Sequence, residues 1–423
     1  MNKEIYKIVI AIISVAIIMG TATLGCVPAF ADTVKTDTVS NISIDVQLIG
    51  DYSKIIQYQT SFESLSNKTS LLSINEIYGL IYSETDQQIL LEKLNIKSDK
   101  SSIRIIDGDA FSTLGLNESK YILNALVSNG ISVIVINDNL ESIHDYLEAN
   151  RITSIEIPKS AIAYGIRYNP DTKASSTIVI TEMGITSGVS TIVDGVSYWL
   201  NYKDESTQKT LSSLVLSEDP VVSDQYVTYY NSHNPYGVIS VTIQYSKVNN
   251  DHSSTRDWWN IKYTFQTKPG KAQWNNHWHT DDTTLIADYD NSGGTLLTYG
   301  PTTTTGTSTA MVAIGVTVNT EGVATVTGNY AWSYTVSNVK VYDYGVMGEN
   351  LAWWYHDIDK TKAVGSATYT TYPGVTIQTV QGTDLTQNDH FKVHWAHTNT
   401  WWWDQYYTDD FYIISLVPWD GVA

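Results

Sequence analysis

Apolar and polar residues alternate with the two-residue period of a β-strand along one long stretch of the chain, residues 302–341. From residue 308 to 318 the odd positions are Thr, Met, Ala and Gly, and the even positions are mostly apolar. After a turn at residues 319–322 the even positions are again mostly apolar. The even positions of interest are Val312, Ile314, Val316, Val318, Val326, Tyr330, Trp332 and Tyr334. The pattern predicts a hairpin that keeps one apolar face through its turn.

Two environments fit this pattern. In a soluble β-sandwich the apolar face packs on another sheet and the polar face meets water. In a transmembrane barrel the apolar face meets lipid, and small polar side chains line a channel. Glu321 is the only charged residue between positions 291 and 339, and it lies in the turn, where a hairpin tip would emerge into water. Tyr330, Trp332 and Tyr334 would then lie at the level of the lipid headgroups.

The remainder of the chain divides by pattern into two regions. Residues 32–203 predict an α/β domain, with strands at 102–107, 132–137, 162–168 and 177–181 and helices at 118–128 and 140–149. The stretch 204–224 is polar and is predicted to be a linker. Residues 225–423 contain repeated strand-like runs separated by turn clusters and predict an all-β sandwich that carries the hairpin.

The first 31 residues have the pattern of a secretory signal peptide. Lys3 and Lys7 precede an apolar run at residues 8–19, and small residues stand at 29 and 31. Cleavage after Ala31 would remove Cys26, the only cysteine, and leave a secreted protein without thiol chemistry. Lipidation of Cys26 is a weaker alternative, because the preceding residues match a lipoprotein signal poorly.

Charge and aromatic content narrow the choice of partner. The formal net charge of −19 argues against nucleic acid and against attraction to anionic lipid. Of the 13 tryptophans, 12 lie after residue 250, partly in runs whose alternate rings would be exposed. Such rings suit lipid headgroups or sugars. The candidates for this recognition are Trp353, Trp354, Tyr355, Trp401, Trp402 and Trp403.

The sequence contains no strong catalytic or metal-binding pattern. Asp107, Asp109 and Asp138 follow strand ends, where caps and turn formers are common. His277 and His279 have a spacing that can hold zinc, but further ligands are not evident. Paired carboxylates, Asp357 with Asp359 and Asp409 with Asp410, raise the possibility of a glycosidase. We therefore expect no enzyme activity, no cofactor and no resident metal.

The order of elements in residues 225–423 resembles the leukocidin/haemolysin family of β-pore-forming toxins. The resemblance consists of a strand-rich sandwich, Leu296–Gly300 leading into the forty-residue hairpin, an aromatic-rich segment, and a closing strand at 391–395. It implies that 302–341 is a stem that inserts into a target membrane when protomers close a ring. It also implies that the aromatic runs form a rim on the bilayer. The α/β region has no counterpart in the small toxins.

Two hypotheses follow. The first is a secreted protein that oligomerises as a ring and inserts its hairpin into a target-cell membrane, because ring closure pairs every strand edge before lipid is reached. The second is a secreted or cell-surface module that binds glycan through a tryptophan-rich sandwich.

Overall fold

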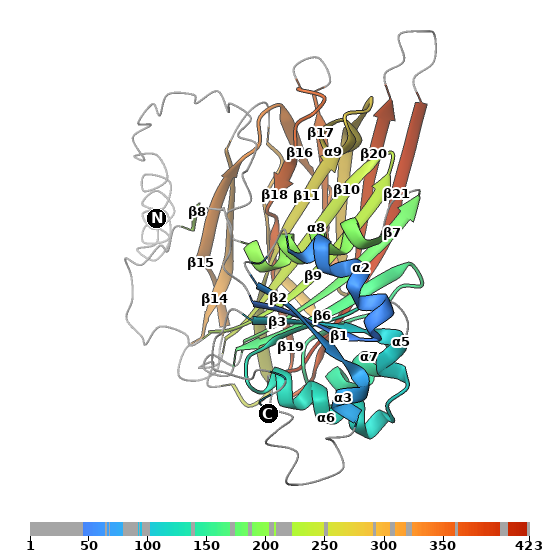
Figure 1. The fold of residues 1–423 in the computed structure, drawn as a ribbon. Coiled ribbons are helices and arrows are strands. Elements are labelled where there is room, and N and C mark those ends of the chain that lie inside the picture. The colour runs from blue at the N-terminus through green and yellow to red at the C-terminus, as the bar shows by residue number, and fades with distance from the viewer. Residues whose placement is uncertain are drawn as a thin grey trace, which may run out of the picture. The chain divides into compact units, whose positions relative to one another are not determined.

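A single sheet, sheet A, runs from the first half of the chain into the second (Figure 1). In the computed structural model the strand order of sheet A is β13-β19-β11-β10-β9-β7-β6-β4-β3-β1-β2, with β18 paired to β11. The structure describes residues 45–63, 66, 68–78, 92, 94, 102–136, 140–169, 174–184, 188–202, 207–208, 222–248, 253–290, 293–304, 309–318, 324–359, 363–397 and 405–420. The proposed signal peptide and Cys26 lie outside these residues.

The N-terminal part of sheet A is the mixed sheet that the sequence predicts. Strands β1 (Asp45–Gly50), β2 (Lys68–Ser73), β3 (Ser102–Asp107) and β4 (Ser132–Ile136) are parallel, and β6 (Ala161–Asn169) joins β4 antiparallel. Strands β3 and β4 are buried along their whole length, which explains their continuous apolar runs. Asp107 caps helix α5 (Gly108–Ser112), since its side chain accepts a hydrogen bond from the Asp109 backbone N–H at 3.2 Å.

Helices cover both faces of this part of the sheet. On one face lie α2 (Tyr52–Phe62) and α8 (Gly188–Asn201), which share a core cluster with strand residues such as Ile105 and Ile178. Helices α3 (Ile74–Tyr78), α5, α6 (Leu116–Val127) and α7 (Leu140–Ala149) contribute to the other cluster. None of the described helices is long and apolar enough to cross a membrane.

The predicted boundary at 204–224 does not separate two sheets. Strand β7 (Ala174–Gly184) pairs parallel with β9 (Val222–Asn234), so the α/β region and the sandwich share backbone hydrogen bonds. Strand β5 (Ser154–Ile155), from the first half, also pairs with β21 (Gln405–Val417). The stretch expected to be a linker already contains the start of β9 and the two-residue strand β8 (Thr207–Gln208). Most of its other residues are outside the described structure.

The C-terminal part is a sandwich of two sheets. In sheet A, β9 is followed by β10 (Gly237–Val248), β11 (Arg256–Pro269), β19 (Gly374–Val380) and β13 (Thr295–Gly300), with β18 (Tyr369–Thr371) beside β11. Sheet B has the order β16-β17-β12-β20-β21-β5, with β16 (Val339–Asp343), β17 (Leu351–Ile358), β12 (Trp278–Asp288) and β20 (Leu385–His397). The short helix α9 (Gly270–Trp274) connects β11 to β12. Residues from both sheets share one apolar core.

The sandwich interior contains titratable side chains. His356 is fully buried, and burial lowers its pKa to about 4 because the imidazolium loses its hydration. Asp389 is also fully buried, and burial raises its pKa to about 7. Its Oδ1 accepts hydrogen bonds from the Tyr263 hydroxyl at 2.9 Å and from the Gln387 amide at 2.7 Å.

Candidate functional site

The predicted hairpin exists as a separate small sheet. Strands β14 (Thr309–Val318) and β15 (Ala324–Thr335) pair antiparallel from Thr309 opposite Thr335 to Val318 opposite Ala324. Among the described residues, the only other strand in this sheet is β8, which pairs with β15 at two positions. The hairpin therefore has no ladder of backbone hydrogen bonds to sheet A or sheet B within the described residues (Figure 1).

Strand β14 has the alternating burial that its sequence predicts from Ala310 to Ile314. Val312 is 1% exposed and its neighbour Met311 is 71% exposed. Ile314 is buried in the same cluster as Val312, and Val316 is buried in a second cluster, whereas Ala313 is exposed. The apolar side of β14 therefore packs against protein in this structure.

The apolar face is held by side-chain contacts with sheet A and its β18–β19 connection. Trp332 and Tyr334 form a buried cluster with Tyr372, and Val316 belongs to a second cluster with Trp258 and Val248. A Cβ atom at Gly374 would lie 2.4 Å from the Trp332 ring, so the glycine makes room for the indole. This packing gives the hairpin a specific resting position without extending the sandwich sheet.

Hydrogen bonds between the hairpin and the sandwich accompany this packing. The Trp332 indole N–H donates to the Tyr372 carbonyl at 2.7 Å, and the Gly315 backbone N–H donates to Thr376 Oγ1 at 2.7 Å. The Thr376 hydroxyl in turn donates to Asn260 Oδ1 at 2.8 Å. These bonds can be exchanged for bonds to water with little net loss, because a typical protein hydrogen bond contributes only about 1 kcal/mol net.

A cation lies beneath the docked hairpin. Lys262 on β11 is 2% exposed, and its Nζ lies 4.9 Å from the Trp332 ring centroid and 5.8 Å from that of Tyr372. Cation–π attraction to two rings contributes about 1–2 kcal/mol per ring when the cation is desolvated. Burial of an ammonium group costs several kcal/mol. Release of the hairpin would rehydrate this cation.

The two ends of the predicted stem 302–341 pair with each other and with sheet B rather than with the hairpin. Residues 339–341 belong to β16 in sheet B. The Thr304 backbone N–H donates to the Val341 carbonyl at 2.8 Å, and the Asp343 N–H donates to Thr303 Oγ1 at 3.0 Å. The small sheet of the hairpin is bounded by β14 and β15, residues 309–335. The sequence misplaced the ends because residues 339–341 continue the strand pattern in a different sheet.

The predicted stem residues do not all share one environment. Val312, Ile314, Val316, Trp332 and Tyr334 are buried and Tyr330 is half-buried. Val326 is 50% exposed although it stands opposite Val316. The register shifts between Ile314 and Val316, so β14 and β15 are not paired continuously along the described hairpin. Glu321 and the Val318 side chain lie outside what the structure describes.

The aromatic candidates separate into two groups. Trp353 and Tyr355 are half-buried on alternate positions of β17, with Tyr344 at 5.3 Å from Trp353 and Tyr342 at 6.1 Å from Tyr355, measured between ring centroids. Trp354 has the opposite orientation, is fully buried, and donates its indole N–H to the Pro301 carbonyl at 3.0 Å. The prediction that Trp354 is a surface recognition residue is therefore wrong. Trp401, Trp402 and Trp403 lie outside the described residues.

The polar surroundings of this aromatic group include a charged pair. His394 Nδ1 lies 2.6 Å from Asp282 Oδ1, and the hydrogen bond to this carboxylate raises the pKa of His394. Burial, together with the carboxylates of Asp282 and Asp357, raises the pKa of Tyr355, which therefore remains a neutral phenol at physiological pH. The surface thus combines phenol rings with carboxylates.

The weaker chemical candidates do not converge. Asp409 lies in the core at 2.7 Å from His233 Nδ1, while the adjacent Asp410 faces the other side of β21 and pairs with Lys392 at 3.1 Å. Neighbouring strand residues point to opposite faces, so these two carboxylates cannot flank one sugar. Among the described residues no group of three His, Cys, Asp or Glu side chains could hold a metal ion. The His277 ring lies beside His397, at 5.5 Å between centroids.

Comparison with known proteins gives little beyond the geometry. No protein-family model matches this chain, and no curated protein matches it. Among solved structures, the NetB toxin of Clostridium perfringens in its membrane-inserted form is similar over 46% of this chain and 97% of its own, with 9% identity and a TM-score of 0.23. A TM-score this low does not establish a shared fold.

Proposed function

We propose that this protein is a secreted pore-forming protein whose hairpin 309–335 leaves the sandwich and inserts into a target membrane as part of a ring of protomers. The observation that carries the proposal is the docking of a period-two ribbon whose two strands carry no charged residue and which, within the described residues, is held to sheets A and B by side chains rather than by a strand ladder. Such a ribbon can separate while sheets A and B keep their backbone hydrogen bonds. In a ring, the free edges of neighbouring hairpins pair with each other. This pairing satisfies the backbone N–H and C=O groups, as is necessary for any strand that spans a membrane.

The proposal assigns a role to each face of the hairpin. The apolar side, which now covers Trp258 and Tyr372, would face lipid after insertion, and the small polar side would line the lumen. Tyr330, Trp332 and Tyr334 would lie near the headgroups. Trp353 and Tyr355 are the described aromatic residues that we propose for the first contact with lipid headgroups or surface glycan. No catalytic step and no cofactor is needed.

Two neighbouring positions test this assignment directly. Val326 and Thr325 are both exposed in the docked hairpin but have opposite parity on β15, so a label at either site should leave docking intact. Each is changed to Cys in a Cys26→Ser background and labelled with an environment-sensitive fluorophore. On adding phospholipid vesicles loaded with calcein, we expect dye release, a rise in emission at Val326→Cys, and little change at Thr325→Cys.

The alternative hypothesis makes the opposite prediction. A glycan-binding module that keeps its hairpin docked would show no change in emission at either position when vesicles are added, and no calcein release. Detergent-resistant rings should accompany release if the proposal is correct. A folded protein that forms no rings and releases no dye from any vesicle composition would eliminate the pore-forming function and leave the binding module.

A further inference from the structure

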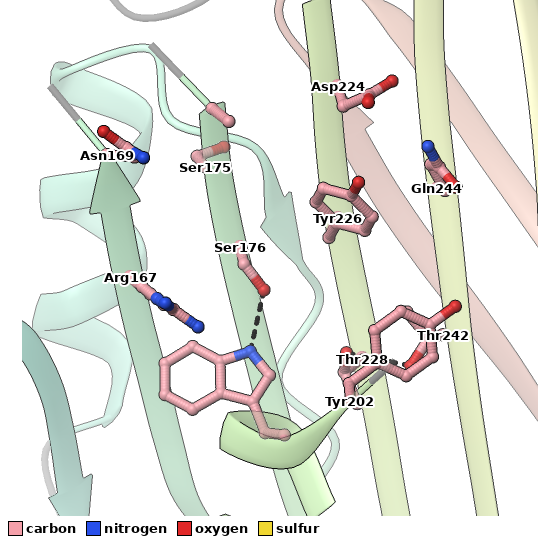
Figure 2. Close-up of a pocket in the computed structure, with 12 residues that line it drawn as sticks. Arg167, Asn169, Ser175, Ser176, Tyr202, Asp224, Tyr226, Thr228, Thr242 and Gln244 are labelled. Carbon is pink, nitrogen blue, oxygen red and sulfur yellow. Dashed lines mark hydrogen bonds between the residues drawn. The ribbon is translucent and has the colours of Figure 1, made fainter. Parts of the chain in front are cut away.

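A polar pocket lies on the same face of sheet A as helix α8. Its volume is about 470 Å³, and its walls come from β6, β7, β9, β10 and the end of α8 (Figure 2). Gln244 in its wall stands opposite Lys262 in the β10–β11 register, and Lys262 lies under Trp332 of the hairpin. The pocket therefore borders the hairpin's docking surface but is built from other residues.

Aromatic rings are fixed in the wall of this pocket. The Tyr202 hydroxyl is within 2.8 Å of Thr264 Oγ1, which holds the ring at the end of α8. Tyr226 projects from β9 on the same side as Thr228, and both line the cavity (Figure 2). Trp199 is held by a 2.7 Å hydrogen bond from its indole N–H to Ser176. Such fixed rings provide apolar surface with little loss of side-chain entropy on binding.

Hydrogen-bonding groups of both kinds surround these rings. Arg167 is exposed, and neither its side chain nor that of Gln244 has a hydrogen-bond or ion-pair partner in the described part of the chain. Asp224 accepts a hydrogen bond from the Ser246 hydroxyl at 2.6 Å, which orients its carboxylate at the pocket. The pocket thus offers a guanidinium, an amide and a carboxylate whose formal charges cancel.

Other ligand classes fit this chemistry poorly. The end of α8 beside the pocket is its C-terminus, whose partial negative charge disfavours phosphate, and a single arginine opposes it. A metal ion would find only one carboxylate among the described lining residues. An extended peptide would need a free strand edge, yet β9 is paired on both sides, with β7 and β10.

We propose that this pocket binds one saccharide unit of a glycan. Sugar hydroxyls both donate and accept hydrogen bonds, so they match Arg167, Asp224 and Gln244, while the C–H face of the sugar ring can lie on Tyr226. The pocket volume lies in the range of about 300–1,000 Å³ that small-ligand sites occupy. The proposal goes beyond membrane insertion, since none of these residues belongs to the hairpin.

The test is a glycan microarray probed with the full-length protein and two pocket variants. Arg167→Ala removes an exposed side chain, so the fold should survive even if Tyr226→Ala proves unstable. The matched controls are Arg256→Ala and Tyr52→Ala, both exposed and outside the pocket lining. We expect the wild type and both controls to bind a common set of glycans, and each folded pocket variant to lose at least about tenfold in apparent affinity, as expected for loss of a hot-spot contact.

Two results would overturn the proposal. One is a folded wild-type protein that binds no glycan on the array. The other is binding that is unchanged in Arg167→Ala and in folded Tyr226→Ala. Calcein release from glycan-free phospholipid vesicles is measured in parallel. Pocket variants that lose array binding but still release dye would show that the two functions are separate, and failure of one assay leaves the other interpretable.

Discussion

Two long hairpins in this protein have similar sequence patterns but different positions in the fold. The β9–β10 hairpin lies inside sheet A, with β7 paired to β9 and β11 paired to β10. The β14–β15 hairpin pairs within itself and, in the described structure, with the two residues of β8. The difference shows that alternation identifies a strand but not whether its outer edge is bonded. That edge decides whether a hairpin can leave its protein.

The largest expected contrast comes from one substitution made in each region. Trp354→Ala removes a fully buried ring of the sandwich and should lower the free energy of unfolding by about 3–5 kcal/mol. Trp332→Ala removes an equally buried ring of the hairpin. If the hairpin opens locally before the sandwich unfolds, as the proposed function requires, this substitution should change the free energy of global unfolding by less than about 1 kcal/mol.

Urea denaturation and native-state proteolysis would measure these two effects. Proteolysis of Trp332→Ala should be faster within residues 309–335 and unchanged elsewhere. Equal losses of unfolding free energy in the two variants would mean that hairpin and sandwich unfold as one unit, and the comparison would fail.

Low pH should destabilise the sandwich and leave the stability of the hairpin unchanged. The folded-state pKa of His356 is about 4, below its ordinary value of 6.5. Between these two pH values His356 is therefore protonated in the unfolded chain and neutral in the folded chain. The resulting stability is present above pH 6.5 and is lost as pH falls toward 4, by up to about 3 kcal/mol. The described strands of the hairpin contain no Asp, Glu, His, Lys or Arg.

His356→Leu should remove this contribution. The difference in unfolding free energy between wild type and variant should shift by about 3 kcal/mol in favour of the variant between pH 7 and pH 4. Urea titrations at both pH values provide the measurement. A constant difference would show that His356 does not titrate as its burial requires.

A smaller effect on hairpin docking is expected from a substitution at Lys262, which lies beneath the hairpin. Lys262→Met keeps the aliphatic contact with Trp332 and removes the buried charge, so the docked state should gain about 1 kcal/mol. Dye release should then slow by roughly fivefold, since 1.4 kcal/mol corresponds to a factor of ten. Lys340→Met, on an exposed position of β16, serves as the control. Faster release from Lys262→Met would mean that the contacts of the ammonium, cation–π contacts included, outweigh the cost of burying it.

Much of the fold could be predicted from local pattern. Strand β3 and helix α7 have the bounds that their sequences predict, because a buried run and a helical period are local signals. The sequence pattern does not predict helix α8, although Ile192, Val196 and Trp199 have helical spacing. Its glycines and β-branched residues have low helix propensity, and packing on sheet A outweighs this.

The site was only partly predictable. The alternation of apolar and polar residues predicts that Val312 and Ile314 are buried on one face, and it predicts that Trp353 and Trp354 face opposite ways. Which of the two rings enters the core depends on strand register between distant segments. The saccharide pocket joins β6, β7, β9, β10 and α8, so no single stretch of sequence indicates it.

A reversible disulfide between hairpin and sandwich tests the central claim most directly. A Cβ atom placed at Gly300 would lie 3.7 Å from the Val312 Cβ, within the range of about 3.5–4.5 Å that a disulfide needs. Gly300→Cys/Val312→Cys in a Cys26→Ser background is compared with each single-cysteine variant. We predict that the oxidised double variant releases calcein at least about 100-fold more slowly, which would correspond to about 2.7 kcal/mol, and that dithiothreitol restores release. Equal release with the disulfide closed would contradict departure of the hairpin from the sandwich.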